Sequence, residues 1–199
     1  RVLFRSKLPS AISHDVYMHC SYDVSENKHW IKKALNQVIR RHLLLEGWTD
    51  RDVAKLGEYN GKPVMVVLLE HFHSSHSIYR THSTSLIAAR DHFHLIGVGS
   101  DAVDDAGRTV FDEFYLLDGS SIFDKLNKLK SICEKNGAAV LYMPSIGMDL
   151  TTIFASNTRL APVQVIALGH PATTHSDFIE YVIVEDDYVG SEKCFSEQL

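Results

Sequence analysis

The stretch PVMVVLLEHFHSSHSIYRTHSTSLIAARDHFHLIGVG, residues 63–99, decides the fold. It opens with an apolar run at Val64–Leu69, passes through a segment of helical periodicity at Ile78–Arg90, and ends in a second apolar run at Phe93–Val98. Nearly continuous runs of Val, Ile and Leu are typical of strands that are buried on both faces, as in a parallel sheet. Two such runs around an amphipathic helix predict a parallel strand–helix–strand unit.

The same alternation continues along the chain. We expect further strands at Glu113–Leu117, Ala138–Tyr142, Val163–Leu168 and Tyr181–Val184. We expect further helices at Ala102–Arg108, Ile122–Glu134 and Leu150–Asn157. Six strands joined by helical crossovers predict an α/β fold with a Rossmann-like, doubly wound parallel sheet.

The N-terminal third has a different pattern. Residues 28–45 carry apolar side chains at helical spacing, and Gly47 can end that helix. The polar stretch Thr49–Lys62 reads as a loop. We therefore divide the chain into a helical region with a linker, 1–62, and a Rossmann-like domain, 63–199. Arg1–Ser6 resembles a translated sequencing adapter and is set aside, and the start at Arg1 and the stop at Leu199 indicate an incomplete chain.

Composition excludes some classes of function. The chain has 199 residues, of which 45% are hydrophobic, and a net charge of −5, so it offers no basic footprint for nucleic acid or an anionic membrane. The longest apolar runs are too short to span a bilayer, and no secretory signal is expected. Three widely spaced cysteines, Cys20, Cys133 and Cys194, predict reduced thiols in a cytoplasmic protein.

Ligands of doubly wound sheets bind beyond the carboxyl ends of the strands, so the loops there are the places to search. The first, Glu70–Ser83, contains His71, His73 and His76. This spacing suits a metal site, and it resembles the metallo-β-lactamase motif except that Ser75 stands where that motif has Asp. A His-cluster metallohydrolase is therefore one hypothesis, and histidines that only hydrogen-bond the loop are the other.

Three further groups carry possible chemistry. His82, Ser83 and Thr84 are expected at the start of a helix, where hydroxyl groups cap backbone amides or an anion binds. A turn after the fifth of these strands, Leu168–His175, is rich in Gly, Pro and Thr, which lets the backbone approach a ligand. His14 and Asp15 could form an imidazole–carboxylate pair.

These loops resemble a known family. His82–Ser85 is similar to the His-Pro-Thr-Ser segment of O-GlcNAc transferases, and Ala161–Thr174 is similar to their Ala-Pro-x-Gln…Gly-Tyr-Pro-Gly-Thr-Ser run. The resemblance is stronger to bacterial HMW-adhesin-type N-glycosyltransferases. It runs from about Leu8 to Leu199 and is densest at Ser13–Asp23, Leu69–Ser85, Tyr142–Ala161 and Ala167–Ser191.

The resemblance implies a GT-B glycosyltransferase, in which two Rossmann-like domains face a cleft behind a helical domain. Such enzymes act in the cytoplasm and transfer a hexose, usually glucose, from a UDP-sugar to the Asn of Asn-x-Ser/Thr in adhesins, with inversion and without a metal or other cofactor. This chain would supply the end of the helical region and the first Rossmann-like domain, and it would lack the second, which makes most of the contacts to UDP.

The resemblance also implies roles for individual residues. His82 matches an active-site histidine near the donor phosphate and the acceptor, and His14 and Asp15 match the acceptor side. Donor contacts are expected at Ser83, Thr84, Leu168, Gly169, His170 and Thr173. Two of these depart from O-GlcNAc transferase, because Ser83 replaces Pro and His170 replaces Tyr. A non-catalytic module that binds a nucleotide or a peptide is the remaining alternative.

Overall fold

The computed structural model describes residues 10–167, 173–185 and 195–198. Its centre is a sheet of parallel strands in the order β4-β3-β2-β5-β6-β7, with the short strand β1 antiparallel to β2. The strands are β1 (Glu58–Tyr59), β2 (Lys62–Leu69), β3 (His94–Gly99), β4 (Glu113–Leu116), β5 (Val140–Met143), β6 (Val163–Ala167) and β7 (Tyr181–Ile183). Without β1, this is the doubly wound order 3-2-1-4-5-6. The α/β, Rossmann-like prediction is confirmed.

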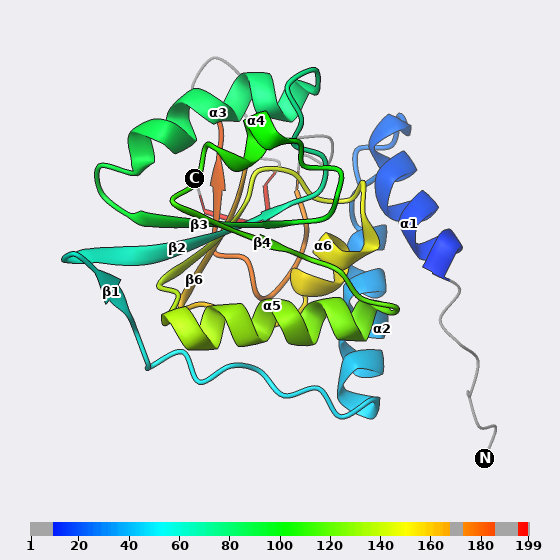
Figure 1. Cartoon of the computed structure of the whole chain (residues 1–199). Coiled ribbons are helices and arrows are strands. Elements are labelled where there is room, and N and C mark those ends of the chain that lie inside the picture. The colour runs from blue at the N-terminus through cyan, green and yellow to red at the C-terminus, as the bar shows by residue number, and fades with distance from the viewer. Residues whose placement is uncertain (1–9, 168–172, 186–194, 199) are drawn as a thin grey trace.

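Helices cover both faces of the sheet (Figure 1). They are α1 (Ser10–His19), the 3₁₀ helix η1 (Cys20–Tyr22), α2 (Ile31–Leu45), α3 (Ser77–Ala89), α4 (Asp105–Arg108), α5 (Ile122–Asn136) and α6 (Leu150–Ala155). α3 and α4 lie on one face, α5 and α6 lie on the other, and α1 and α2 stand beside α6 (Figure 1). The buried apolar side chains form one cluster on each face.

Local chemistry explains where the helices begin and end. The Ser121 hydroxyl accepts from the Asp124 amide, and the Asp124 carboxylate accepts from the Ser121 amide, which makes a capping box at the start of α5. Gly137 ends the same helix in the left-handed conformation, at φ 62°. α4 is shorter than expected because Asp104 caps it, accepting from the Gly107 amide at 2.8 Å.

The N-terminal third packs directly on the sheet. Ile39 and Leu43 of α2 and Tyr17 of α1 are buried in the same cluster as the strand side chains of that face. Three elements described in this third, α1, η1 and β1, were not expected from the sequence. The domain boundary at residue 62 stays a prediction. Within the described ranges, no helix is long and apolar enough to cross a membrane.

Candidate functional site at the carboxyl edge of the sheet

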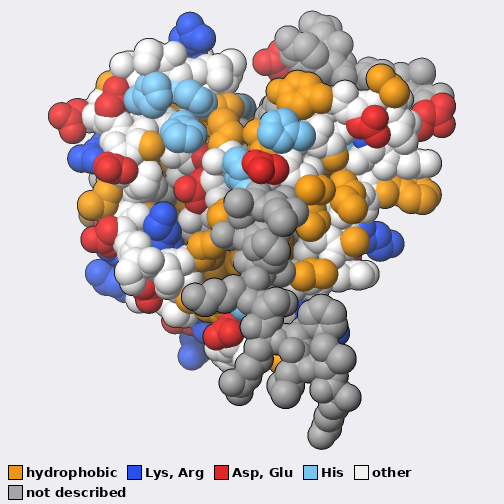
Figure 2. Space-filling model, turned by 90° about the vertical axis from the view of Figure 1, so that its right-hand side faces the viewer, with side chains coloured by type: hydrophobic (Ala, Val, Ile, Leu, Met, Phe, Trp, Pro, Cys, Tyr) orange, Lys and Arg blue, Asp and Glu red, His pale blue; other side chains and the backbone are white. Residues whose placement is uncertain are grey.

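The doubly wound order changes direction between β2 and β5, and ligands of such sheets bind at this switch point. The chain leaves β2 at Glu70 and leaves β5 through the loop 144–149, which leads into α6. α1 lies against this edge, and Figure 2 looks onto that side of the molecule, where histidine side chains gather in the upper half. If the residues predicted from the sequence form a ligand site, they should lie at or near this carboxyl edge of the sheet.

Glu70 occupies the switch point as a buried carboxyl group that is 4% exposed. Its Oε1 accepts from the Gly147 amide at 2.8 Å, the Asp149 amide at 2.9 Å and the Thr152 hydroxyl at 2.5 Å. Burial raises the pKa of Glu70, and these hydrogen bonds oppose that rise. Glu70 thus ties the end of β2 to the loop that follows β5.

His14 and Asp15 of α1 do form a pair. His14 Nδ1 lies 3.6 Å from Asp15 Oδ1, and His14 Nε2 lies 3.2 Å from the carbonyl oxygen of Met148. Both residues line an open hollow of about 460 Å³, together with Met148, Asp149 and Thr151. The predicted imidazole–carboxylate pair therefore lies beside the switch point, with space for a ligand group next to it.

His82 lies on the other face of the sheet, over β5. Its Nδ1 lies 3.4 Å from the hydroxyl of Tyr142. Burial lowers the pKa of His82, and Glu185 partly opposes this. No hydrogen bond or ion pair in the described part of the chain joins His82 to His14 or Asp15.

The expectation that His82, Ser83 and Thr84 begin a helix is wrong. α3 begins at Ser77, and His76 is its N-cap, accepting from the Ile78 amide at 3.3 Å through Nδ1. Ser83 and Thr84 therefore lie inside the helix, where their neighbours Thr81 and Ser85 donate their hydroxyls to helix carbonyls. The helix N-terminus that could face an anion is formed by His76 and the residues after it.

The histidine loop is not arranged as a metal site. His73 Nδ1 lies 2.9 Å from the Ser75 hydroxyl, and the ring of His76 packs near those of His71 and His73, with centroids 5.6 and 5.2 Å away. Among the described residues, no group of three or more His, Cys, Asp or Glu side chains is placed to hold a metal ion. This geometry gives the metallohydrolase hypothesis no support.

The predicted donor turn is described only in part. Leu168, Gly169 and His170 lie outside the described residues. Thr173 is fully buried, and its hydroxyl bonds Ser196 and Glu197, each at 2.7 Å. Its hydroxyl is thus already engaged within the protein.

Two side chains of α2 hold the backbone of this turn. Lys32 Nζ donates to the Thr173 carbonyl at 2.7 Å, and Asn36 Nδ2 donates to the Thr174 carbonyl at 2.9 Å. Lys32 is fully buried, and burial lowers its pKa to about 8. Neither Lys32 nor Glu70 was expected at the site from the sequence. Lysine next to the apolar positions of an amphipathic helix is ordinarily at the surface, and Glu70 was visible only as a carboxylate directly after a buried strand.

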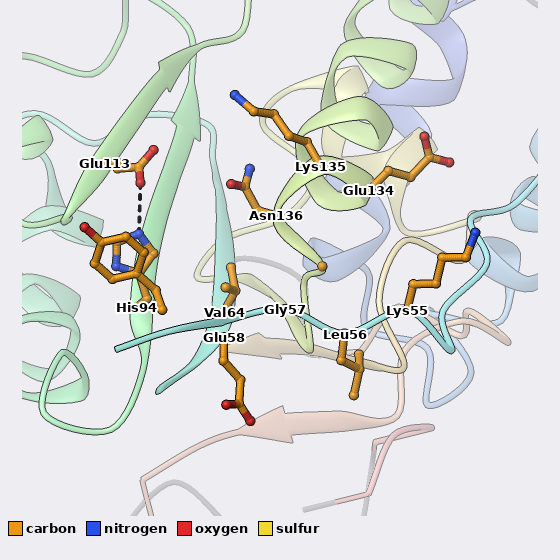
Figure 3. A pocket seen from close by; sticks show the side chains of 12 residues that line it. Lys55, Leu56, Gly57, Glu58, Val64, His94, Glu113, Glu134, Lys135 and Asn136 are labelled. Atoms are coloured by element: carbon orange, nitrogen blue, oxygen red, sulfur yellow. Dashed lines mark hydrogen bonds and ion pairs between the residues drawn. The ribbon is translucent and has the colours of Figure 1, made fainter. Parts of the chain in front are cut away.

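A further pocket, of about 320 Å³, lies at the opposite, amino edge of the sheet (Figure 3). In it His94 Nε2 lies 3.1 Å from Glu113 Oε1, and the ring of Tyr59 stacks on His94 at 4.2 Å. Ligands of doubly wound sheets bind at the carboxyl edge, so this pocket lies on the side of the sheet away from the switch point.

The structure places the chain in a class. It resembles a solved mutant O-GlcNAc transferase of Thermobaculum terrenum with a TM-score of 0.69, over 96% of this chain and 37% of that one, at 17% sequence identity. At that identity the likeness concerns the fold, which is that of a Rossmann-like domain of a GT-B glycosyltransferase.

The sequence relatives are more specific. The family model "HMW1 domain 2" matches residues 5–43, which include all of α1 and most of α2. Two proteins named UDP-glucose:protein N-beta-glucosyltransferase, from Actinobacillus pleuropneumoniae serotype 5b (strain L20) and serotype 7 (strain AP76), are each 74% identical over 98% of this chain. The resemblance to HMW1-type N-glycosyltransferases is therefore confirmed. The chain spans about a third, 32%, of the length of these relatives.

Proposed function

We propose that this chain forms one wall of the active site of a UDP-glucose:protein N-glucosyltransferase. The observation that carries the proposal is the 74% identity to two glucosyltransferases over 98% of the chain. Because the chain covers 32% of their length, we assign the activity to a whole protein. In that protein, on the family resemblance, a second Rossmann-like domain makes most of the contacts to UDP. The donor and the protein acceptor follow from the names of these relatives.

The proposed reaction is an inverting transfer onto the side-chain amide of Asn in Asn-x-Ser/Thr. The bond between the sugar's anomeric carbon and the UDP oxygen breaks, and its electron pair leaves with UDP. The amide nitrogen forms the new bond to that carbon and gives up a proton. An amide nitrogen is a poor nucleophile, so a carboxylate or an imidazole near it would assist.

The positions of the predicted residues are compatible with these needs. His14 and Asp15 border the 460 Å³ hollow, which has room for an acceptor side chain. We place His82 on the donor side, near the diphosphate. Because burial lowers the pKa of His82, its ring is neutral near pH 7 and would act there as a hydrogen-bonding group. We assign donor contacts to Ser83, Thr84 and the turn 168–173 on the family resemblance alone.

We further propose that the protein acts in the cytoplasm, that its acceptors are adhesins, and that transfer needs no metal. These points rest on the resemblance to the HMW-adhesin-type enzymes. Transfer that continues undiminished in EDTA would support the last of them, and transfer that stops in EDTA and returns with a divalent cation would refute it.

The experiment is made in the whole protein, with UDP-glucose and a peptide that contains Asn-x-Ser/Thr. We expect His82→Ala to lower turnover on the order of 100-fold, which is the usual loss when a group that stabilises the leaving charge is removed. His92→Ala is the matched control, because His92 is an exposed histidine just beyond the end of α3. Equal turnover in the two variants would refute the assignment of His82 to the active site.

A further inference from the structure

Glu70 places a carboxyl group in the protein interior at the switch point of the sheet, where ligands of doubly wound sheets bind. It is 4% exposed, its Oε1 accepts from three donors, and its Oε2 is buried without a hydrogen-bond partner in the described part of the chain. A buried carboxyl group is costly, so the role of Glu70 is sought in the groups that it holds.

All three donors belong to the segment between β5 and α6. The Gly147 and Asp149 amides flank Met148, and the Thr152 hydroxyl follows in α6. The Asp149 amide and the Met148 carbonyl belong to the same planar peptide unit, so the bond from the Asp149 amide to Glu70 sets the direction of the Met148 carbonyl. The bond from the Gly147 amide holds the preceding part of the loop.

The Met148 carbonyl in turn contacts His14. A carbonyl oxygen only accepts, so the proton of this 3.2 Å contact is on His14 Nε2. His14 Nδ1 then lies 3.6 Å from Asp15 Oδ1, which is an ion-pair distance and not a hydrogen bond, and the two atoms attract each other when Nδ1 also carries a proton. A continuous set of contacts therefore runs from Glu70 through the loop to the His14–Asp15 pair.

α1, which carries that pair, rests on the same loop. Gly147 has φ +110°, and a Cβ atom there would lie 2.7 Å from Met18 Sδ and 3.2 Å from the ring of Tyr17. Glycine suits both the positive φ and this close approach, because a Cβ atom would press on Met18 and Tyr17 of α1. The loop held by Glu70 is thus also the surface on which α1 is seated.

We propose that Glu70 is a positioning residue for the glucosyl transfer: it holds the loop 147–149 so that the Met148 carbonyl orients His14 and directs His14 Nδ1 at Asp15. This inference rests on the proposed function. Glu70 itself contacts neither the sugar donor nor the acceptor, and it acts through the loop.

The test compares Glu70→Gln with Glu113→Gln in the whole protein. Glu113 is a matched control at the amino edge, where its carboxylate bonds both His94 and the Tyr115 hydroxyl (Figure 3 shows the bond to His94). Glutamine keeps the shape of Glu70 but is a weaker acceptor for three donors. We expect Glu70→Gln to lower kcat roughly tenfold, and Glu70→Ala on the order of 100-fold, with KM for UDP-glucose little changed. Glu113→Gln should leave kcat unchanged.

A second readout does not depend on activity. The ring nitrogens of His14 are followed by NMR in histidine-labelled protein, with His14→Asn to assign the signal. We expect the wild type to show a proton fixed on Nε2, and Glu70→Gln and Gly147→Ala to show a mixture of the two tautomers.

The outcomes separate the two claims. An unchanged His14 signal in Glu70→Gln overturns the positioning role, and so does a changed signal with unchanged kcat. A whole protein that folds but transfers no glucose contradicts the proposed function, and the NMR signal then still decides whether Glu70 orients His14. If Glu70→Ala does not fold, Glu70→Gln and Gly147→Ala decide the question.

Discussion

Lys32 allows a quantitative test of how the N-terminal helices are joined to the predicted donor turn. Its side chain is fully buried, its Nζ donates to the Thr173 carbonyl at 2.7 Å, and the same atom lies 4.9 Å from the ring centroid of Tyr17. Burial lowers the pKa of Lys32 from its ordinary 10.5 to about 8, although Cys20 and Glu197 act in the opposite direction. The perturbation is Lys32→Met, which keeps the length of the side chain and removes its charge.

The magnitude follows from this pKa. Between about pH 8 and pH 10.5 the folded state binds fewer protons than the unfolded state. The free energy of unfolding therefore rises with pH in this window, and this gain is lost again as pH falls to about 8. At about 1.4 kcal/mol for each pH unit, the burial of the charged lysine costs roughly 3 kcal/mol at neutral pH. Lys32→Met removes this cost but leaves the Thr173 carbonyl without its donor, which costs about 1–3 kcal/mol.

The two effects nearly cancel at neutral pH, so we expect Lys32→Met to change the free energy of unfolding there by less than about 2 kcal/mol. The difference appears in the pH dependence. From neutral pH to about pH 10.5 the wild type should gain roughly 3 kcal/mol relative to the variant, measured by urea unfolding followed by tryptophan fluorescence. Lys33 is the exposed neighbouring residue, and the free energy of unfolding of Lys33→Met should change with pH in parallel with that of the wild type. Parallel curves for Lys32→Met as well would refute the burial of Lys32 and its bond to Thr173.

Other variants test the remaining parts of the account. Burial raises the pKa of Glu70 above 4.5, so the folded state holds this proton more tightly than the unfolded state. The wild type should therefore lose stability relative to Glu70→Gln as pH rises from about 4.5. Urea unfolding from acid to neutral pH in which the two stabilities stay parallel would contradict the raised pKa. Gly137 has φ +62°, and the Cβ atom of an alanine there would lie 2.1 Å from the Gly57 amide nitrogen. Gly61 has φ +75°, but a Cβ atom there would have no neighbour within 4 Å. In thermal unfolding Gly61→Ala should cost about 1 kcal/mol and Gly137→Ala clearly more, and equal costs would show that Gly57 does not pack there.

The sheet could be predicted from the sequence because its central strands, β2, β3, β5 and β6, are largely buried and leave apolar runs. Val64–Leu69 and Phe93–Val98 were found within two residues of β2 and β3. The helix α5 was found because its apolar positions repeat with the helical period. These signals are local, so a single sequence carries them.

The arrangement of the candidate site depends on contacts between residues far apart in the chain, and such contacts leave no local pattern in the sequence. His14 meets Met148, and Lys32 meets Thr173, across more than a hundred residues. The periodicity placed this helix at Ile78–Arg90, within one residue of α3, but its cap was misassigned because Ser83 and Thr84 have the chemistry of caps, whereas the actual cap is the less usual His76. The Glu70 carboxylate could have been suspected from its place directly after a buried strand.

The central claim is that this chain lines the active site of a protein that transfers glucose to asparagine. The most direct measurement incubates the whole protein with UDP-glucose and an Asn-x-Ser/Thr peptide and locates the modification by tandem mass spectrometry. We expect one hexose on the asparagine of the peptide after reaction with the wild type, and a strongly reduced amount with His82→Ala. An unmodified peptide from a folded protein that binds UDP-glucose would contradict the claim and would favour a module that binds the nucleotide without chemistry.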